Sequence, residues 1–159
     1  MNRVKTTLLA LVILGALSTA LFLWKYEDWI AIPNARAPMV ALLKDPASAQ
    51  TRNERITKAG ALCGEVNAKN GMGGYAGFKR YISLGPESNY IEGTGSLSKA
   101  TTAELIEQLE QKNAMLKTYL SLQRDGVDVA PPSESRMDEL IEEEIFRERW
   151  QQLCEAKSA

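Results

Sequence analysis

The feature that most constrains this chain is an uncharged apolar run near its beginning, residues 6–24. Nineteen helical residues cover about 28 Å, close to the roughly 30 Å hydrocarbon core of a lipid bilayer. Arg3 and Lys5 precede the run, and acidic residues follow it. Because basic residues favour the cytoplasmic side, this asymmetry predicts a cytoplasmic N-terminus over residues 1–5. The run therefore predicts a single-pass inner-membrane anchor with the remaining chain in the periplasm.

A cleaved signal peptide is the alternative for the same segment. Ser18-Thr19-Ala20 offers the small residues of a cleavage site, which would remove residues 1–20. The apolar run continues past this site to Trp24, so cleavage would leave an apolar N-terminus on a secreted domain. The anchor is therefore favoured, and both alternatives export the rest of the chain.

The composition argues against most catalytic and metal sites. The 159 residues include no histidine and two cysteines, so a Ser-His-Asp triad, a histidine-ligated zinc or a four-cysteine cluster cannot form within one chain. The net charge is +3 over residues 44–99 and −6 over residues 100–159, without the strongly basic cluster typical of nucleic-acid binding. We therefore expect no enzyme activity, no cofactor, no metal and no nucleic-acid partner.

Beyond the anchor, the sequence predicts a tether over residues 25–36 and one α+β domain over residues 37–159. Pro38 suits the first turn of a short helix that ends at Lys44-Asp45-Pro46. A three-stranded antiparallel meander should follow, because two runs alternate between apolar and polar residues and turn-forming residues separate them. The three strands are expected over residues 49–57, 61–69 and 75–84.

Two helices are predicted at the end of the domain, as a hairpin over residues 101–155. Thr101-x-x-Glu104 is a capping box at the start of the first helix, and Asp125-Gly126 ends that helix at Arg124. The apolar stripe of the second helix shifts by about half a turn after Ile145, which predicts different neighbours along its length. One short heptad is also visible, with these residues: Leu105, Leu109, Lys112, Leu116 and Tyr119.

The predicted export determines which state is expected for the two cysteines. Cys63 and Cys154 would lie in an oxidising compartment, where an even pair favours a disulfide. Such a bridge would fasten the last helix to the middle of the domain. Two separate buried thiols are the alternative. A redox-active site is not expected, because the chain lacks Cys-x-x-Cys spacing.

Two stretches, LLKDPASAQTRNERI (42–56) and CGEVNAKNGMGGYAGFKRYI (63–82), resemble a pattern found in small bacterial and prophage envelope proteins. The final pair Trp150 and Cys154 extends the similarity. The resemblance implies a short exported or lipid-anchored domain and supports the bridge from Cys63 to Cys154. It implies no particular activity. This chain departs from the pattern at Thr51, where an aromatic residue is expected, and over residues 98–133, which look like an insertion.

The loop over residues 67–75 is the most function-like segment. Its glycines and the basic residues nearby could bind an anion or a carboxylate of a partner. A structural hairpin loop is the favoured alternative, because glycines supply positive φ and asparagines cap the backbone. The candidate partner-binding residues are Asn67, Lys69, Asn70, Tyr75, Lys79 and Arg80.

Three functional hypotheses follow. The leading one is a non-enzymatic, membrane-anchored periplasmic domain that binds another envelope protein, in an immunity, inhibitor or superinfection-exclusion role. The second is a structural subunit of an envelope machine or phage lysis apparatus that assembles through helices 101–124 and 134–155. The third is a cell-wall hydrolase that pairs Glu65 with Glu87 or Glu92, although solvated surface charge explains these carboxylates more simply.

Overall fold

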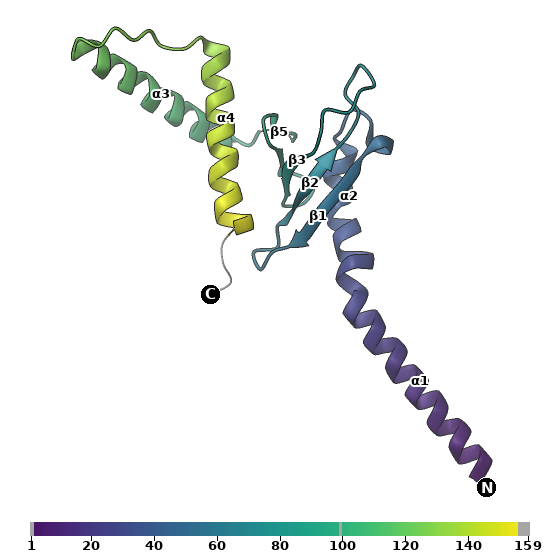
Figure 1. The fold of residues 1–159 in the computed structure, drawn as a ribbon. Coiled ribbons are helices and arrows are strands. Elements are labelled where there is room, and N and C mark those ends of the chain that lie inside the picture. Colours follow the sequence, from purple (N-terminus) through teal and green to yellow (C-terminus); the bar gives the residue numbers. More distant parts are fainter. Residues whose placement is uncertain (1, 99, 156–159) are drawn as a thin grey trace.

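A five-stranded antiparallel sheet in the order β1-β2-β3-β4-β5 is the centre of the fold (Figure 1). The computed structural model describes residues 2–98 and 100–155, with the side chains of residues 11–94, 96–98 and 100–155. The strands are β1 (Gln50–Ile56), β2 (Leu62–Asn67), β3 (Lys79–Ser83), β4 (Asn89–Ile91) and β5 (Gly95–Ser96). The α-helices are α1 (Asn2–Tyr26), α2 (Ile32–Ala41), α3 (Thr102–Arg124) and α4 (Glu134–Trp150). Short helical turns occupy Glu27–Ala31, Pro46–Ser48 and Gln151–Glu155.

The fold is α+β, but the predicted three-stranded meander is wrong. The first three strands lie where the sequence places them, and β4 and β5 extend the sheet beyond β3. These two strands have three and two residues, too few for an alternating pattern to be recognised. They also contain asparagine, glycine and serine, which have low strand propensity. Pairing with β3, rather than local preference, makes them strands.

The predicted transmembrane anchor over residues 6–24 is also corrected. No helix in the described part of the chain is long and apolar enough to cross a membrane. Residues 6–24 lie within α1, and Lys25 follows the uncharged run. Ser18 and Thr19 add hydroxyls to this stretch, which donate hydrogen bonds to the carbonyl of Gly15.

The segment predicted as a tether, residues 25–36, is helical. A π-helical turn over Glu27–Ala31 joins α1 to α2 without a break (Figure 1). Pro33 lies in the first turn of α2, whereas Pro38, predicted in the first turn of a helix, lies inside it. Helix α2 packs on the sheet, and Met39 on this helix is completely buried.

The sheet is buried on both faces, which separates the core into two clusters. On one face, α2 covers the first cluster, whose buried residues are Met39, Leu62, Val66, Tyr81 and Ile91. On the other face, α4 covers the second, formed by Ala61, Cys63, Ile82, Tyr90, Phe146, Trp150 and Cys154. Consecutive residues of β2 are therefore buried on opposite sides.

The carboxylate of Glu54 lies against the first cluster. A β-bulge between Arg52 and Arg55, with Asn53 at φ 54°, sets the local course of β1, and the Glu54 side chain is only 11% exposed. Tyr81 donates its hydroxyl to Glu54, and Arg36 of α2 donates to the same carboxylate at 2.9 Å. Burial and the hydrogen bond to Glu54 raise the pKa of Tyr81 well above its usual range. This network ties α2, β1 and β3 together.

Gly64 makes room for this network. A Cβ built on Gly64 would lie 2.9 Å from Glu54 Cγ and 2.9 Å from the Tyr81 ring. Both neighbours are held by their mutual hydrogen bond. We therefore expect Gly64→Ala to lower the free energy of unfolding by about 1–3 kcal/mol through overpacking.

Gly71→Ala is the matched control, because an added Cβ there meets no atom within 4 Å. Urea denaturation of both variants measures the difference. Equal stability of the two variants would contradict the close packing around Gly64.

The predicted disulfide is present. Cys63 of β2 and Cys154, just beyond α4, are bridged with a Cα–Cα distance of 5.9 Å. The backbone carbonyl of Cys154 also accepts a hydrogen bond from Arg55, and Trp150 packs in the same cluster. The bridge therefore attaches the end of the chain covalently to the second strand.

Because the bridge closes a loop of 91 residues, it should restrict the unfolded chain strongly. We expect the double variant Cys63→Ala/Cys154→Ala to lose about 4–5 kcal/mol of unfolding free energy. Urea denaturation measures the loss, and hydrogen exchange should show Gln151–Glu155 opening first. An unchanged unfolding free energy would contradict this role of the bridge.

Candidate functional site

Asn67 and Asn70, two of the predicted partner-binding residues, organise their own loop. The Asn70 side-chain oxygen accepts hydrogen bonds from the backbone N–H groups of Met72 and Gly74, at 3.0 and 3.1 Å. The Asn67 side-chain oxygen accepts from Gly77 N–H at 3.1 Å, and Gly77 has φ 94°. These contacts agree with a structural loop. Partner binding by either residue stays a prediction.

The four other predicted residues do not form one cluster. The Lys69 ammonium lies 5.8 Å from the Tyr75 ring, and Tyr75 donates its hydroxyl to the Ser48 carbonyl at 3.3 Å. Arg80 pairs with Glu92 and lies over the Trp150 ring at 5.1 Å, so it belongs to the contact between sheet and α4. The hydrogen bond to Glu92 raises the pKa of Arg80. Lys79 is half-buried beside it on β3.

The carboxylates considered for hydrolysis have other partners. Glu65 pairs with Arg52, and Glu92 pairs with Arg80, whose hydrogen bond lowers the pKa of Glu92. A catalytic acid needs the opposite shift, towards a raised pKa. Among the described residues, no group of three or more cysteine or acidic side chains could hold a metal ion.

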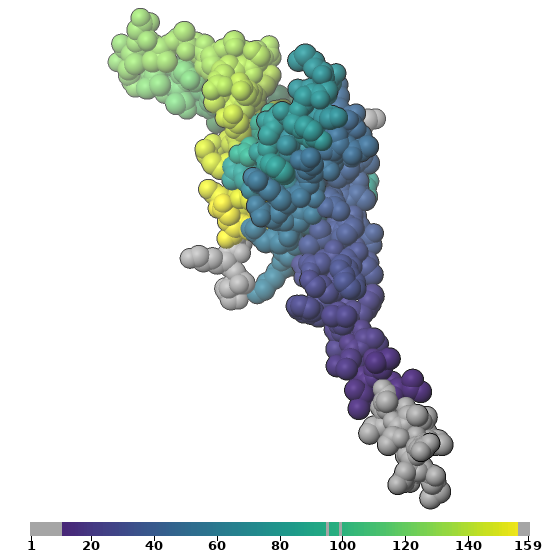
Figure 2. All heavy atoms as spheres, turned by 45° about the vertical axis from the view of Figure 1, so that its right-hand side comes forward, coloured from purple at the N-terminus to yellow at the C-terminus, as the bar shows by residue number. Residues whose placement is uncertain are grey.

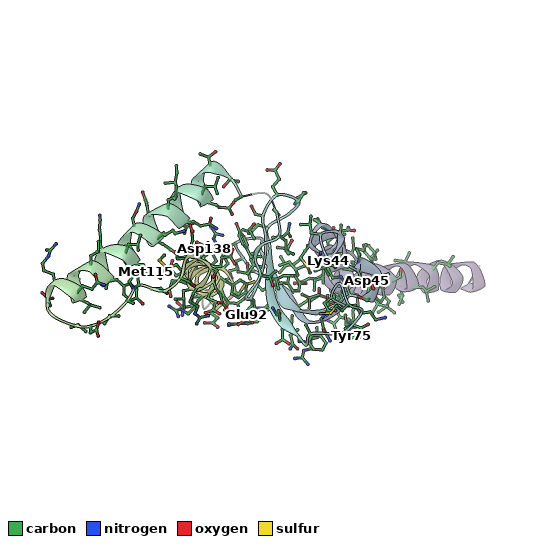
Figure 3. All side chains as sticks on the ribbon, turned by 90° about the horizontal axis from the view of Figure 1, so that it is seen from above. Lys44, Asp45, Tyr75, Glu92, Met115 and Asp138 are labelled. Atoms are coloured by element: carbon green, nitrogen blue, oxygen red, sulfur yellow. A yellow bond between two sulfur atoms is a disulfide. The ribbon has the colours of Figure 1, made fainter. Side chains whose placement is uncertain are left out.

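Helices α3 and α4 form a hairpin, and α4 attaches it to the sheet. Helix α4 changes neighbours along its length, as predicted: Phe146 and Trp150 pack on the sheet, whereas Ile141 faces α3. The tip of the hairpin extends away from the sheet (Figures 1 and 2). Figure 3 shows Met115 and Asp138 on this hairpin, on the other side of the sheet from Tyr75.

Contact between α3 and α4 is sparse. All 23 residues of α3 are described, and none of them is buried. Lys112 bonds to Glu134 and Asp138 of α4 at 3.0 and 3.1 Å. Two hollows of about 430 and 680 Å³ flank the contact; apolar side chains that line them include Leu105, Leu109, Met115, Tyr119, Leu122 and Ile141. Salt bridges and partly filled hollows, rather than a closed core, join the two helices.

One side of α3 presents apolar residues to solvent. Ile106, Leu109 and Leu120 are 51%, 59% and 60% exposed. With the half-buried Leu116 and the exposed Asn113 and Gln123 they follow each other at intervals of three or four residues, so they share one face. We call these six residues the outer face of α3. The sequence predicts a heptad that includes Leu109 and Leu116, but periodicity alone cannot distinguish a covered stripe from an open one.

A polar junction holds the start of α3 against the sheet. Tyr90 of β4 donates its hydroxyl to Glu104, which also completes the predicted capping box with Thr101. Arg149 of α4 lies 4.3 Å from the Tyr90 ring and bonds to Glu107 at 2.9 Å. Burial opposes ionisation of Glu104, but hydrogen bonds from Tyr90 and Thr101 and the charge of Arg149 outweigh it. The pKa of Glu104 is therefore lowered.

This lowered pKa predicts a pH dependence. The unfolded chain protonates Glu104 near 4.5, before the folded protein does, so the stabilisation is complete above that pH. It is lost as the pH falls through the lower folded value. We expect Glu104→Gln to cost about 1–3 kcal/mol of unfolding free energy at pH 7 and less at pH 3.

Urea denaturation across this pH range measures the effect, with Glu148→Gln as the control at an exposed carboxylate on α4. A difference between wild type and Glu104→Gln that stayed constant from pH 7 to pH 3 would contradict the assignment.

No protein-family model, curated protein sequence or solved structure matches this chain. The resemblance to small envelope proteins therefore stays a prediction, and the geometry of the described residues carries the functional argument.

Proposed function

We propose that this chain is a non-catalytic protein-binding domain whose binding surface is the outer face of α3. The observation that carries the proposal is that α3 buries none of its described residues while Ile106, Leu109 and Leu120 are more than half exposed. Contiguous exposed apolar residues on a folded domain mark interaction surfaces. Apolar side chains are also exposed on α1 and in loops, among them Trp24 and Met72; the exposed residues of α3 differ in lying at heptad spacing on one helix face.

The disulfide supports a place of action in an oxidising compartment, such as the periplasm. An immunity, inhibitor or exclusion role would fit a domain that works by binding alone. The alternative is a structural subunit of a larger envelope assembly, and the exposed helix face supports it equally. The two roles use the same surface and differ in what covers it.

Site-specific photocrosslinking tests whether the outer face is covered. A benzoylphenylalanine at Leu109, in the chain expressed in its native cells, should give a covalent adduct with another polypeptide. The same photoreactive residue at Ser121, exposed on a different side of α3, is the control and should give little. Adducts of equal yield at both positions, or none at Leu109, would contradict the proposal.

A further inference from the structure

We propose that the outer face of α3 binds the outer face of a second copy of this chain, with the two α3 helices antiparallel. This inference rests on the proposed binding role of the outer face and names its occupant. It follows from the heptad spacing of that face, from the one asparagine within it and from the distribution of charge along α3.

The outer face has the spacing of a coiled-coil seam. Ile106, Leu109, Asn113, Leu116, Leu120 and Gln123 alternate at intervals of three and four residues, which are the a and d positions of a heptad. This register differs from the heptad visible in the sequence. Lys112 bonds to α4, and Tyr119 is half-buried and lines the larger hollow beside α4.

A two-fold axis between residues 114 and 115 gives the most complete overlap of two antiparallel copies. Leu109 then lies opposite Leu120 of the second copy, and Asn113 lies opposite Leu116. The two asparagines are offset by about 4.5 Å along the helix axis, near enough for their side-chain amides to meet. A polar residue at one a position is a known way to select register and partner number at some cost in affinity.

Charge along α3 favours the antiparallel arrangement. Glu110 in the first half of the helix and Lys117 in the second flank the outer face, whereas Glu104, Glu107 and Lys112 bond to Tyr90 and α4. In an antiparallel pair, Glu110 of one copy flanks the seam beside Lys117 of the other. In a parallel pair, Lys112 would flank Lys117 of the second copy, which is repulsive. The helix is therefore complementary to itself only when reversed, as a two-fold symmetric interface requires.

The surroundings of α3 leave room for a second copy. The hairpin tip stands away from the sheet and from α1 (Figures 1 and 2). Both α3 helices would retain their own α4, so the dimer would contain a four-helix arrangement with the two α3 helices at its centre. The seam spans only 18 residues, which predicts a dimer of moderate affinity.

Sedimentation equilibrium of the full-length, disulfide-bonded chain tests the inference. We expect a monomer–dimer equilibrium in the micromolar range. Leu109→Ser should raise the dissociation constant by about 100-fold, because each dimer loses two seam leucines. Leu122→Ser is the matched control, because Leu122 is 36% exposed, lines the hollow beside α4 and lies off the seam. The dimer of this variant should have a dissociation constant near that of the wild type. Asn113→Leu should tighten the dimer about 10-fold.

A charge exchange tests the orientation. Glu110→Lys and Lys117→Glu should each weaken the dimer about 5- to 10-fold at low salt, and the double variant should restore wild-type affinity. If the double variant does not regain wild-type affinity, the antiparallel arrangement is overturned.

A chain that stays monomeric would overturn self-association. The proposed binding role would then be judged by the adduct at Leu109: an adduct with a different polypeptide keeps that role and overturns only this inference. The absence of any adduct at Leu109 overturns both.

Discussion

The attachment of α4 to the sheet is the contact on which the rest of the surface depends. Helix α4 is held by the bridge from Cys63 to Cys154 and by Phe146 and Trp150 in the same cluster. Helix α3 has little support of its own, since it contacts α4 through salt bridges and the sheet through one polar junction. The outer face of α3 is therefore presented only while α4 stays in place. A covalent bond is a suitable anchor for α4, because this helix supports α3, whose outer face is exposed.

The two faces of the sheet have different chemistry for a related reason. The α2 face encloses the carboxylate of Glu54, which is satisfied by Tyr81 and Arg36, whereas the cluster under α4 is cross-linked by the disulfide and has Arg80 and Arg149 over its aromatic rings. A buried polar network specifies one arrangement of its elements, because any displacement leaves a charge unpaired. A disulfide specifies a distance but tolerates rotation. Helix α2 is thus fixed in register on β1 and β3, and α4 is held chiefly at its C-terminal end.

Much of the local structure could be predicted from the sequence, because local signals determine it. The capping box at Thr101 and Glu104, the stripe change in α4 and the first three strands depend on residues within a few positions of each other. The disulfide could be predicted from the number of cysteines and the assumption of export. What failed depends on distant contacts: β4 and β5 exist because β3 pairs with them.

The sequence predicted helix 101–124 as an assembly element, but it could not show which face of that helix is open. An amphipathic stripe on α3 reports that its apolar residues prefer to leave water, but it does not say which surface they reach. In the single chain, the side of α3 towards α4 is only partly covered, and Ile106, Leu109 and Leu120 of the outer face stay more than half exposed. Helices in proteins gain most of their stability from tertiary packing, so a long helix with so little contact in the single chain lacks much of that stabilisation. The same residues that define the open face are therefore the ones whose burial by a partner would stabilise α3 most.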